Sequence, residues 1–233
     1  MIRVRAIVRK DLREYRRTRS IVATMAVIPL IFVLIPVIQI FTGDPAALRH
    51  EDLLGIMLAI PAITPTVIAA YAVVGEREQG TLEPLLTTPV RRDELVLGKA
   101  LAVLVPTLTV SYAVYGLVVA AIALFAREAV ASATLRGTVI AAQAVFTPLI
   151  AGWSIWVGVA ISARVSEVRV AQQLGSLASL PTVLIALVIA AGAVHPTTGL
   201  VIGLAAALAV LNGLGWQAAS RMLDRERLIT GIR

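Results

Sequence analysis

Hydrophobic residues in this chain gather in long uncharged runs that are separated by short polar segments. Six runs contain no Asp, Glu, Lys, Arg or His, and they cover residues 21–41, 53–75, 100–125, 137–161, 174–194 and 199–219. A helix needs about 20 apolar residues to cross the hydrocarbon core of a bilayer, whereas a membrane β-strand would show alternation over about ten residues. The pattern therefore predicts an all-α integral membrane protein with six transmembrane helices in a single domain, residues 1–233.

The composition agrees with a membrane environment. Hydrophobic residue types make up 58% of the chain and charged types 15%, whereas soluble proteins have roughly 45–50% and 25%. So little charge does not cover the surface of a soluble globule of this size. The chain contains no cysteine, which excludes disulfide scaffolds and thiolate metal sites.

The basic residues lie mostly on one side of the predicted spans. Of the 21 Lys and Arg residues, 18 fall in the N-terminal segment, in residues 76–99, in residues 162–173 and in the C-terminal tail. By the positive-inside rule these segments, and with them both termini, are cytoplasmic. The net charge of +7 is thereby explained by topology, and we expect the lipid bilayer and no nucleic acid as a partner.

Residues 1–20 are predicted to form a basic amphipathic helix. Four apolar residues recur at helical spacing, while the arginines lie elsewhere and Asp11 interrupts the edge of the stripe; the apolar residues are Val4, Val8, Leu12 and Tyr15. Such a helix lies along the inner membrane surface with its arginines toward anionic headgroups. The alternative is a basic flank that only fixes the topology.

The segment after the second span, residues 76–99, carries the most informative pattern. Gly80 permits a turn, Thr81 is suited to cap a helix, and Pro89 ends it. Between them Leu82, Leu85 and Leu86 lie at positions i, i+3 and i+4, which places them on one ridge. Asp93 and Glu94 then begin a helix that continues through Lys99 into the third span. A leucine ridge on a charged loop needs a partner, either another protein or the inner face of this chain and its lipid.

This segment resembles the coupling helix of the membrane subunits of ABC-2 type transporters. The matching run is Glu76-Arg77-Glu78-x-Gly80-Thr81-Leu82-Glu83-x-Leu85-Leu86-x-Thr88-Pro89-Val90, followed by Glu94 to Gly98-Lys99. In that family the coupling helix docks in a groove of the ATP-binding subunit. The resemblance implies that the ATPase contacts are Glu76, Arg77, Glu78, Gly80, Thr81, Leu82, Glu83, Leu85, Leu86, Pro89, Arg91 and Arg92. Arg91 departs from the family pattern, because family members often have Ser or Thr there.

The resemblance implies a permease subunit of an ATP-driven exporter in a bacterial cytoplasmic membrane. Two permease subunits, a homodimer, would sit on two ATP-binding subunits, which hold the ATP and Mg²⁺; this chain would carry no cofactor and would not itself be an enzyme. The sequence agrees on one point: a phosphate-binding loop reads G-x-x-x-x-G-K-[ST]. Here Gly98-Lys99 has Asp93 in place of the first glycine and is followed by Ala100.

Two other function classes fit the sequence less well. A secondary carrier or channel not driven by ATP usually places ionisable groups within its spans, and the six runs have none, although intramembrane prolines could open ion-binding breaks. An intramembrane enzyme needs acid–base groups or a metal. His50 and His195 lie in outer loops without a nearby carboxylate cluster at ligand spacing, and Asp44, Glu51 and Asp52 near His50 are interpreted as solvated loop charges.

Thr64 and Thr66, on either side of Pro65, are the candidate residues of a translocation path. Gly199-x-x-x-Gly203, Gly213 and Gly215 suit close helix packing, either within the chain or between two copies.

Overall fold

The computed structural model describes residues 2–44, 48, 52–70, 74–75, 92–190 and 197–222. The described part of the chain is helical and contains no strand. Its elements are α1 (Ile2–Arg17), α2 (Arg19–Thr42), η1 (Leu53–Leu58), α4 (Ala59–Ala70), α7 (Arg92–Phe125), α8 (Glu128–Thr134), α9 (Gly137–Ser162), α10 (Val168–Ala190) and α11 (Thr198–Met222).

Five of the described helices are long and apolar enough to cross a membrane. They contain the segments Ile21–Thr42, Asp93–Phe125, Gly137–Ser162, Val168–Val188 and Gly199–Arg221. The first and third of these agree with the predicted spans to within one residue at each end. The helix of the predicted third span begins at Arg92, as the acidic pair Asp93 and Glu94 indicated. The predicted span 174–194 begins earlier, at Val168, because Arg169 is accommodated in the first turn of α10.

The predicted second span is less regular than the other five. It begins as the 3₁₀ turn η1 and continues as the 12-residue helix α4; residues 71–73 are not described, and Val74 and Gly75 follow. Proline has no N–H to offer the carbonyl four residues earlier, so Pro65, which lies inside α4, removes one α-helical hydrogen bond. That the second predicted span crosses the membrane, and with it the count of six spans, therefore remains a prediction.

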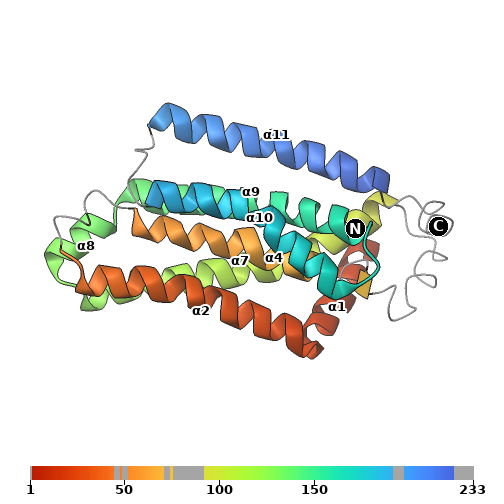
Figure 1. Cartoon of the computed structure of the whole chain (residues 1–233), viewed down its shortest axis with the longest axis horizontal. Coiled ribbons are helices and arrows are strands. Elements are labelled where there is room, and N and C mark those ends of the chain that lie inside the picture. The colour runs from red at the N-terminus through yellow and green to blue at the C-terminus, as the bar shows by residue number, and fades with distance from the viewer. Residues whose placement is uncertain are drawn as a thin grey trace.

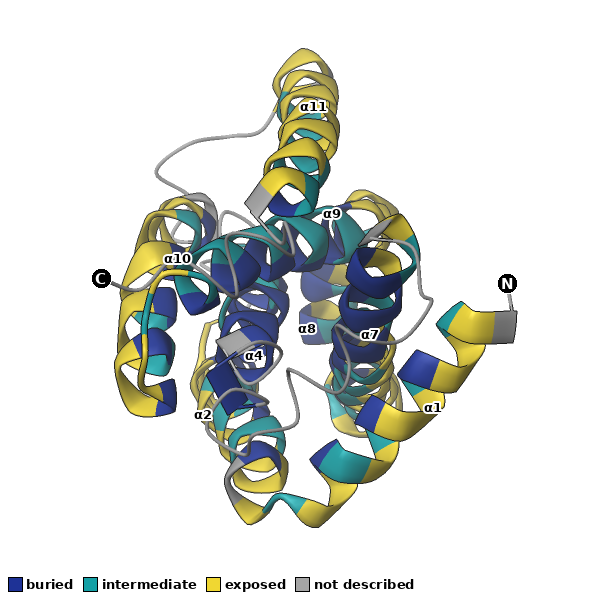
Figure 2. Cartoon of the chain, turned by 90° about the vertical axis from the view of Figure 1, so that its right-hand side faces the viewer, coloured by how far each residue is buried: buried dark blue, intermediate teal, exposed yellow. Residues whose placement is uncertain are grey.

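The helices form an elongated bundle around α4. The long helices run side by side along the molecule, with α1 at one end and α8 at the other (Figure 1). Seen down the bundle, α4 lies between α2, α7, α9 and α10, and the buried faces of the outer helices turn toward it (Figure 2). Between Ala59 and Ala69 all side chains are buried except that of Ile63, which is partly buried. A helix surrounded in this way is the natural centre of a membrane bundle.

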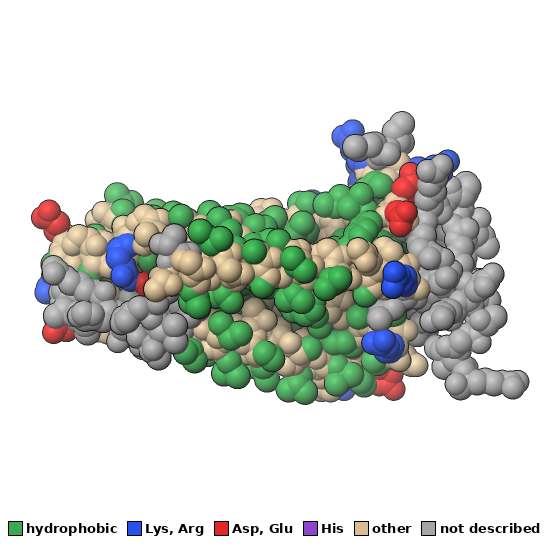
Figure 3. Space-filling view, turned by 90° about the horizontal axis from the view of Figure 1, so that it is seen from above, with side chains coloured by type: hydrophobic (Ala, Val, Ile, Leu, Met, Phe, Trp, Pro, Cys, Tyr) green, Lys and Arg blue, Asp and Glu red, His purple; other side chains and the backbone are tan. Residues whose placement is uncertain are grey.

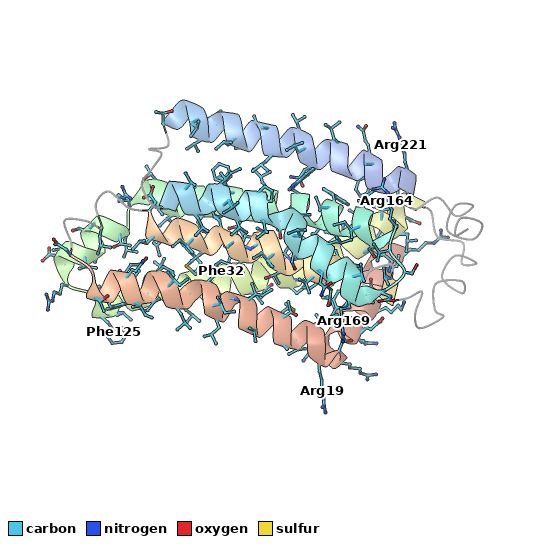
Figure 4. The ribbon with its side chains drawn as sticks, in the orientation of Figure 1. Arg19, Phe32, Phe125, Arg164, Arg169 and Arg221 are labelled. Atoms are coloured by element: carbon cyan, nitrogen blue, oxygen red, sulfur yellow. The ribbon has the colours of Figure 1, made fainter. Side chains whose placement is uncertain are left out.

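The outer surface is that of a membrane protein. Large hydrophobic side chains are exposed along α2, α7, α10 and α11, and hydrophobic side chains cover the middle of the molecule while charged ones lie toward its ends (Figure 3). We call the end that carries α1 the basic end; Arg19, Arg164, Arg169 and Arg221 lie there (Figure 4). At the far end Arg136 forms an ion pair with Asp52.

Helix α11 packs on the outside of α9, and Asn212 supplies side-chain hydrogen bonds to this contact. Its side chain donates hydrogen bonds to the carbonyls of Leu149 (2.9 Å) and Leu208 (2.8 Å) and accepts one from Nε1 of Trp156 (3.2 Å). The expected close packing at glycines is confirmed at Gly215, where an added Cβ would lie 2.7 Å from the Trp156 ring. At Gly199, Gly203 and Gly213 an added Cβ would meet no described atom within 4 Å, so close packing within the described part of the chain is wrong for these three.

Candidate functional site

The residues on either side of the segment 76–91 both lie at the basic end of the bundle. On one side, the backbone N–H of Val74 donates to Oγ of Ser162 at the end of α9 (3.2 Å), and Val74 packs with Val168 and Ala171 of α10. On the other side α7 begins at Arg92, with Asp93 and Glu94 in its first turn, where negative charge favours a helix N-terminus. The chain thus leaves and re-enters the bundle at the same end.

The predicted ATPase contacts themselves fall on this segment. Arg92 is the first residue of α7, and the others lie outside the described residues: Glu76, Arg77, Glu78, Gly80, Thr81, Leu82, Glu83, Leu85, Leu86, Pro89 and Arg91. The coupling helix therefore stays a prediction from the sequence.

Helix α1 packs against the first turns of α7, next to this segment. Ile7 faces Gly98 so closely that a Cβ added at Gly98 would lie 2.8 Å from Cγ2 of Ile7. Nearby, Nζ of Lys99 lies 4.0 Å from Oδ2 of Asp11. The exposed pair Arg3–Glu94, at 3.7 Å, continues the contact toward the start of both helices.

The buried line on α1 differs slightly from the predicted apolar stripe. Ile7, Asp11 and Tyr15 are buried, at spacings of four residues. Tyr15 belongs to both lines, whereas Val4, Val8 and Leu12 lie beside the buried line and are partly exposed. Asp11, which interrupted the stripe in the sequence, belongs to the face that meets α7. Its spacing of four from both Ile7 and Tyr15 is the signal that could have shown this.

Thr64 and Thr66 lie in the middle of the bundle, and both side chains are fully buried. Oγ1 of Thr66 donates to the carbonyl of Ala62 (3.0 Å), a bond that a threonine in a membrane helix commonly makes within its own helix. Its methyl group is so close to α10 that a Cβ added at Gly175 would lie 2.8 Å from it. The gap between Thr66, Ser154 and Ser179 is too narrow for a water molecule. In this conformation the two threonines are closed off from solvent.

Further buried polar side chains lie on α7 and α9, at helical spacing. Thr107, Ser111 and Tyr115 occupy one face of α7, and Oη of the neighbouring Tyr112 donates to the carbonyl of Ala144 on α9 (2.8 Å). On α9, Gln143 and Thr147 are buried one turn apart. Sequence reasoning did not single out Tyr115 or Thr147, although their spacing of four from Ser111 and Gln143 is visible in the sequence.

A groove of about 790 Å³ lies between α2 and α10, and sequence reasoning did not anticipate it. Apolar side chains form most of its walls, Val67 of α4 reaches it from the bundle centre, and Arg169, Gln172 and Gln173 lie toward the basic end; the lining residues are Ala23, Thr24, Val27, Ile28, Val67, Arg169, Gln172, Gln173, Ser176, Leu177 and Leu180. Because Val67 is the neighbour of Thr66, the groove connects the outer surface with the helix that carries the candidate path residues.

The described residues show no centre for a metal: no three His, Cys, Asp or Glu side chains among them gather closely enough to hold one. The arrangement offers instead a closed polar core and a helical contact at the basic end.

A comparison with protein families identifies the family of this chain. The model of the family described as ABC-2 family transporter protein matches residues 5–195, which include most of α1, the segment 76–91 and the spans through α10. The resemblance inferred from the sequence is thereby confirmed. A comparison with curated proteins gave no significant match.

Proposed function

Because this chain belongs to the ABC-2 transporter family and is a multi-pass membrane permease of an ABC transporter, we propose that it is an exporter subunit driven by a separate ATP-binding protein. Two copies of the chain and two ATP-binding subunits, which hold ATP and Mg²⁺, make up the transporter. It resides in a bacterial cytoplasmic membrane with both termini in the cytoplasm and six helices across the bilayer.

The observation that carries this proposal is the family match over the segment 76–91 together with the position of its flanks. Val74 is tied to the ends of α9 and α10, and α7 starts at Arg92, so a movement of the segment acts on three helices at the basic end. A partner that pushes or pulls Leu82, Leu85 and Leu86 would thereby reach the whole bundle. The basic end is also the side that the positive-inside rule assigns to the cytoplasm, where ATP is available.

The translocation path proposed here involves Thr64 and Thr66 and the groove between α2 and α10. Val67 lines this groove, one residue from Thr66, whose hydroxyl is engaged within its own helix. A relative movement of α2 and α10 widens the groove toward α4 and brings the polar core into contact with it. The closed state of the core then corresponds to a stage of the cycle in which the path is shut.

The test is reconstitution with the ATP-binding subunit encoded by the neighbouring reading frame. We expect that subunit to co-purify with this chain, to hydrolyse ATP in proteoliposomes, and to change its hydrolysis rate when the permease is present. The chain alone should bind no ATP. A carrier or channel is the alternative; it is supported instead if no ATPase co-purifies and the chain alone dissipates an imposed proton gradient, followed with a pH-sensitive dye.

A further inference from the structure

Among the residues whose burial the structure describes, only two charged side chains are buried, and they face each other. Asp11 on α1 and Lys99 on α7 are each about 4% exposed, with Nζ and Oδ2 4.0 Å apart. A charge that is removed from water without a partner is strongly disfavoured. Each of these two charges therefore contributes to offsetting the cost of burying the other.

The packing around this pair is tight and continuous. One turn before Asp11, Ile7 occupies the space that Gly98 leaves open, and a side chain larger than hydrogen at Gly98 would collide with it. One turn after Asp11, Tyr15 packs into a hydrophobic cluster that includes Val96 and Val103. The contact thus follows one face of α1 from residue 7 to residue 15.

The position of the contact links it to the segment 76–91. Lys99 lies two turns into α7, whose first residue follows that segment directly. Separating α1 from α7 would leave Asp11 and Lys99 buried without each other, or would draw water into an apolar contact. Sliding of α1 along α7 is opposed as well, because Ile7 fits only against Gly98, where α7 has no side chain.

We propose that the Asp11–Lys99 ion pair clamps α1 to the first two turns of α7, so that both move as one rigid body during the transport cycle. Asp11 and Lys99 are then positioning residues: they touch no substrate but carry the displacement of the segment 76–91 into the basic helix α1. This inference rests on the proposed function, since it assigns a mechanical role within an ATP-driven cycle.

Cysteine cross-linking tests the clamp directly, because the chain has no cysteine of its own. In the double variant Ile7→Cys/Gly98→Cys, the Cβ atoms would start 3.0 Å apart, close to the about 3.5–4.5 Å of a disulfide. We expect oxidation to cross-link the two helices equally well in the nucleotide-free complex and in the complex trapped with ADP and vanadate. The oxidised complex should hydrolyse ATP at the rate of its reduced form. Cross-linking in only one state, or hydrolysis that stops on oxidation, overturns the rigid-body proposal.

The role of the ion pair is tested in the same cysteine background. Asp11→Asn should lower cross-linking at least several-fold in the trapped state while the ATPase still co-purifies, and the exchange Asp11→Lys/Lys99→Asp should restore it. The matched control is Arg3→Gln, which breaks the exposed pair of the same two helices (side chains 53% and 25% exposed) and should leave cross-linking unchanged. Full cross-linking in the Asp11→Asn protein means that the pair does not hold the helices together.

The clamp and the proposed function fail in different ways. If no ATPase binds, the proposed function is wrong, yet the effect of Asp11→Asn on cross-linking can still be measured in the subunit alone. If the ATPase binds and responds to the permease while Asp11→Asn changes nothing, only the clamp is wrong. A loss of folded protein in the single variant is recognised by size-exclusion chromatography, and the charge exchange then decides.

Discussion

Asn212 shows how much a single polar side chain contributes where a helix is attached at the edge of a membrane bundle. Its amide joins α11 to Leu149 and Trp156 of α9, while most of the large apolar side chains of α11 face outward. Interhelical hydrogen bonds in membranes contribute about 0.6–2 kcal/mol. We therefore expect Asn212→Leu to destabilise the subunit by about 1–2 kcal/mol, measured as a lower midpoint of thermal unfolding in detergent. Gln217→Leu, an exposed position on the same helix, is the control and should change little.

Gly158 is a residue of α9 that lies in close contact with α4. A Cβ added there would lie 2.7 Å from Cβ of Ala69 and 3.1 Å from the carbonyl oxygen of Thr66, and overpacking of this kind costs about 1–3 kcal/mol. Gly158→Ala should therefore lower the thermal stability. The comparison is Gly116→Ala in α7, where a Cβ meets no described atom within 4 Å and the gain in helix propensity of about 1 kcal/mol remains. Equal stability of the two variants would show that α4 and α9 can move apart to accommodate the added methyl group at little cost.

At the scale of the element, the segment 76–91 offers a prediction that distinguishes its two faces. Leu82, Leu85 and Leu86 form the ridge that we expect to be buried in the ATPase, and buried apolar anchors dominate such interfaces. Leu85→Asp would place a charge in the groove of the ATP-binding subunit, at a cost of several kcal/mol. The ATPase should then fail to co-purify, whereas insertion into the membrane should be unaffected.

The matched control is Thr87→Asp, which introduces the same charge on the opposite side of the predicted helix and should leave the ATPase bound. If Leu85→Asp binds the ATPase as well as the unmodified chain does, the ridge packs on lipid or on its own subunit. If both variants lose the ATPase, the added charge rather than the ridge explains the result.

The bounds of a helix could be predicted from the sequence where contact with lipid excludes charged residues from it. They were less predictable where contacts between helices of the chain determine them. The uncharged runs that became α2 and α9 could be read almost to the residue, because any charge in them would lie in hydrocarbon. The start of α10 could not be predicted in this way. Arg169 ends the uncharged run in the sequence, but at the basic end of the bundle a helix can include a charged residue. The 3₁₀ turn η1 packs among neighbouring helices, and a single sequence does not show which helices those are.

The candidate site divides in the same way. The leucine ridge follows from local spacing and is visible in the sequence itself, although the described residues do not reach it. The pair Asp11–Lys99 joins positions far apart in the sequence, and nothing local to Asp11 identifies its partner. The groove between α2 and α10 likewise depends on the packing of two helices that are distant in the chain, so composition alone could not reveal it.

For the whole molecule, the asymmetry of the basic residues and the number of spans lead to one topology. Both flanks of the segment 76–91 and the arginines of α1 lie at the basic end. We expect this end to be cytoplasmic, because 18 of the 21 cations of the sequence fall in the segments predicted to lie on that side. Six crossings return the C-terminus to that side, whereas five crossings would leave the two termini on opposite sides. The second predicted span decides between these, because the described part of η1 and α4 is shorter than the other apolar helices.

Reporter fusions along the chain check this topology. We expect a fusion after Gln79 to be cytoplasmic and fusions after His50 and after His195 to be external, because the loops that contain His50 and His195 carry few cations and follow odd-numbered spans. A cytoplasmic reporter at His50 together with one at Gln79 would mean that η1 and α4 enter the bilayer without crossing it. A cytoplasmic reporter at His195 would contradict the predicted hairpin of the last two spans. Helix α11 would then have to reach its contact with Trp156 from the other side. The hydrogen bond from Trp156 to Asn212 holds α11 beside α9. In the six-span arrangement α10 crosses the membrane outward and α11 crosses back beside α9, which agrees with this contact.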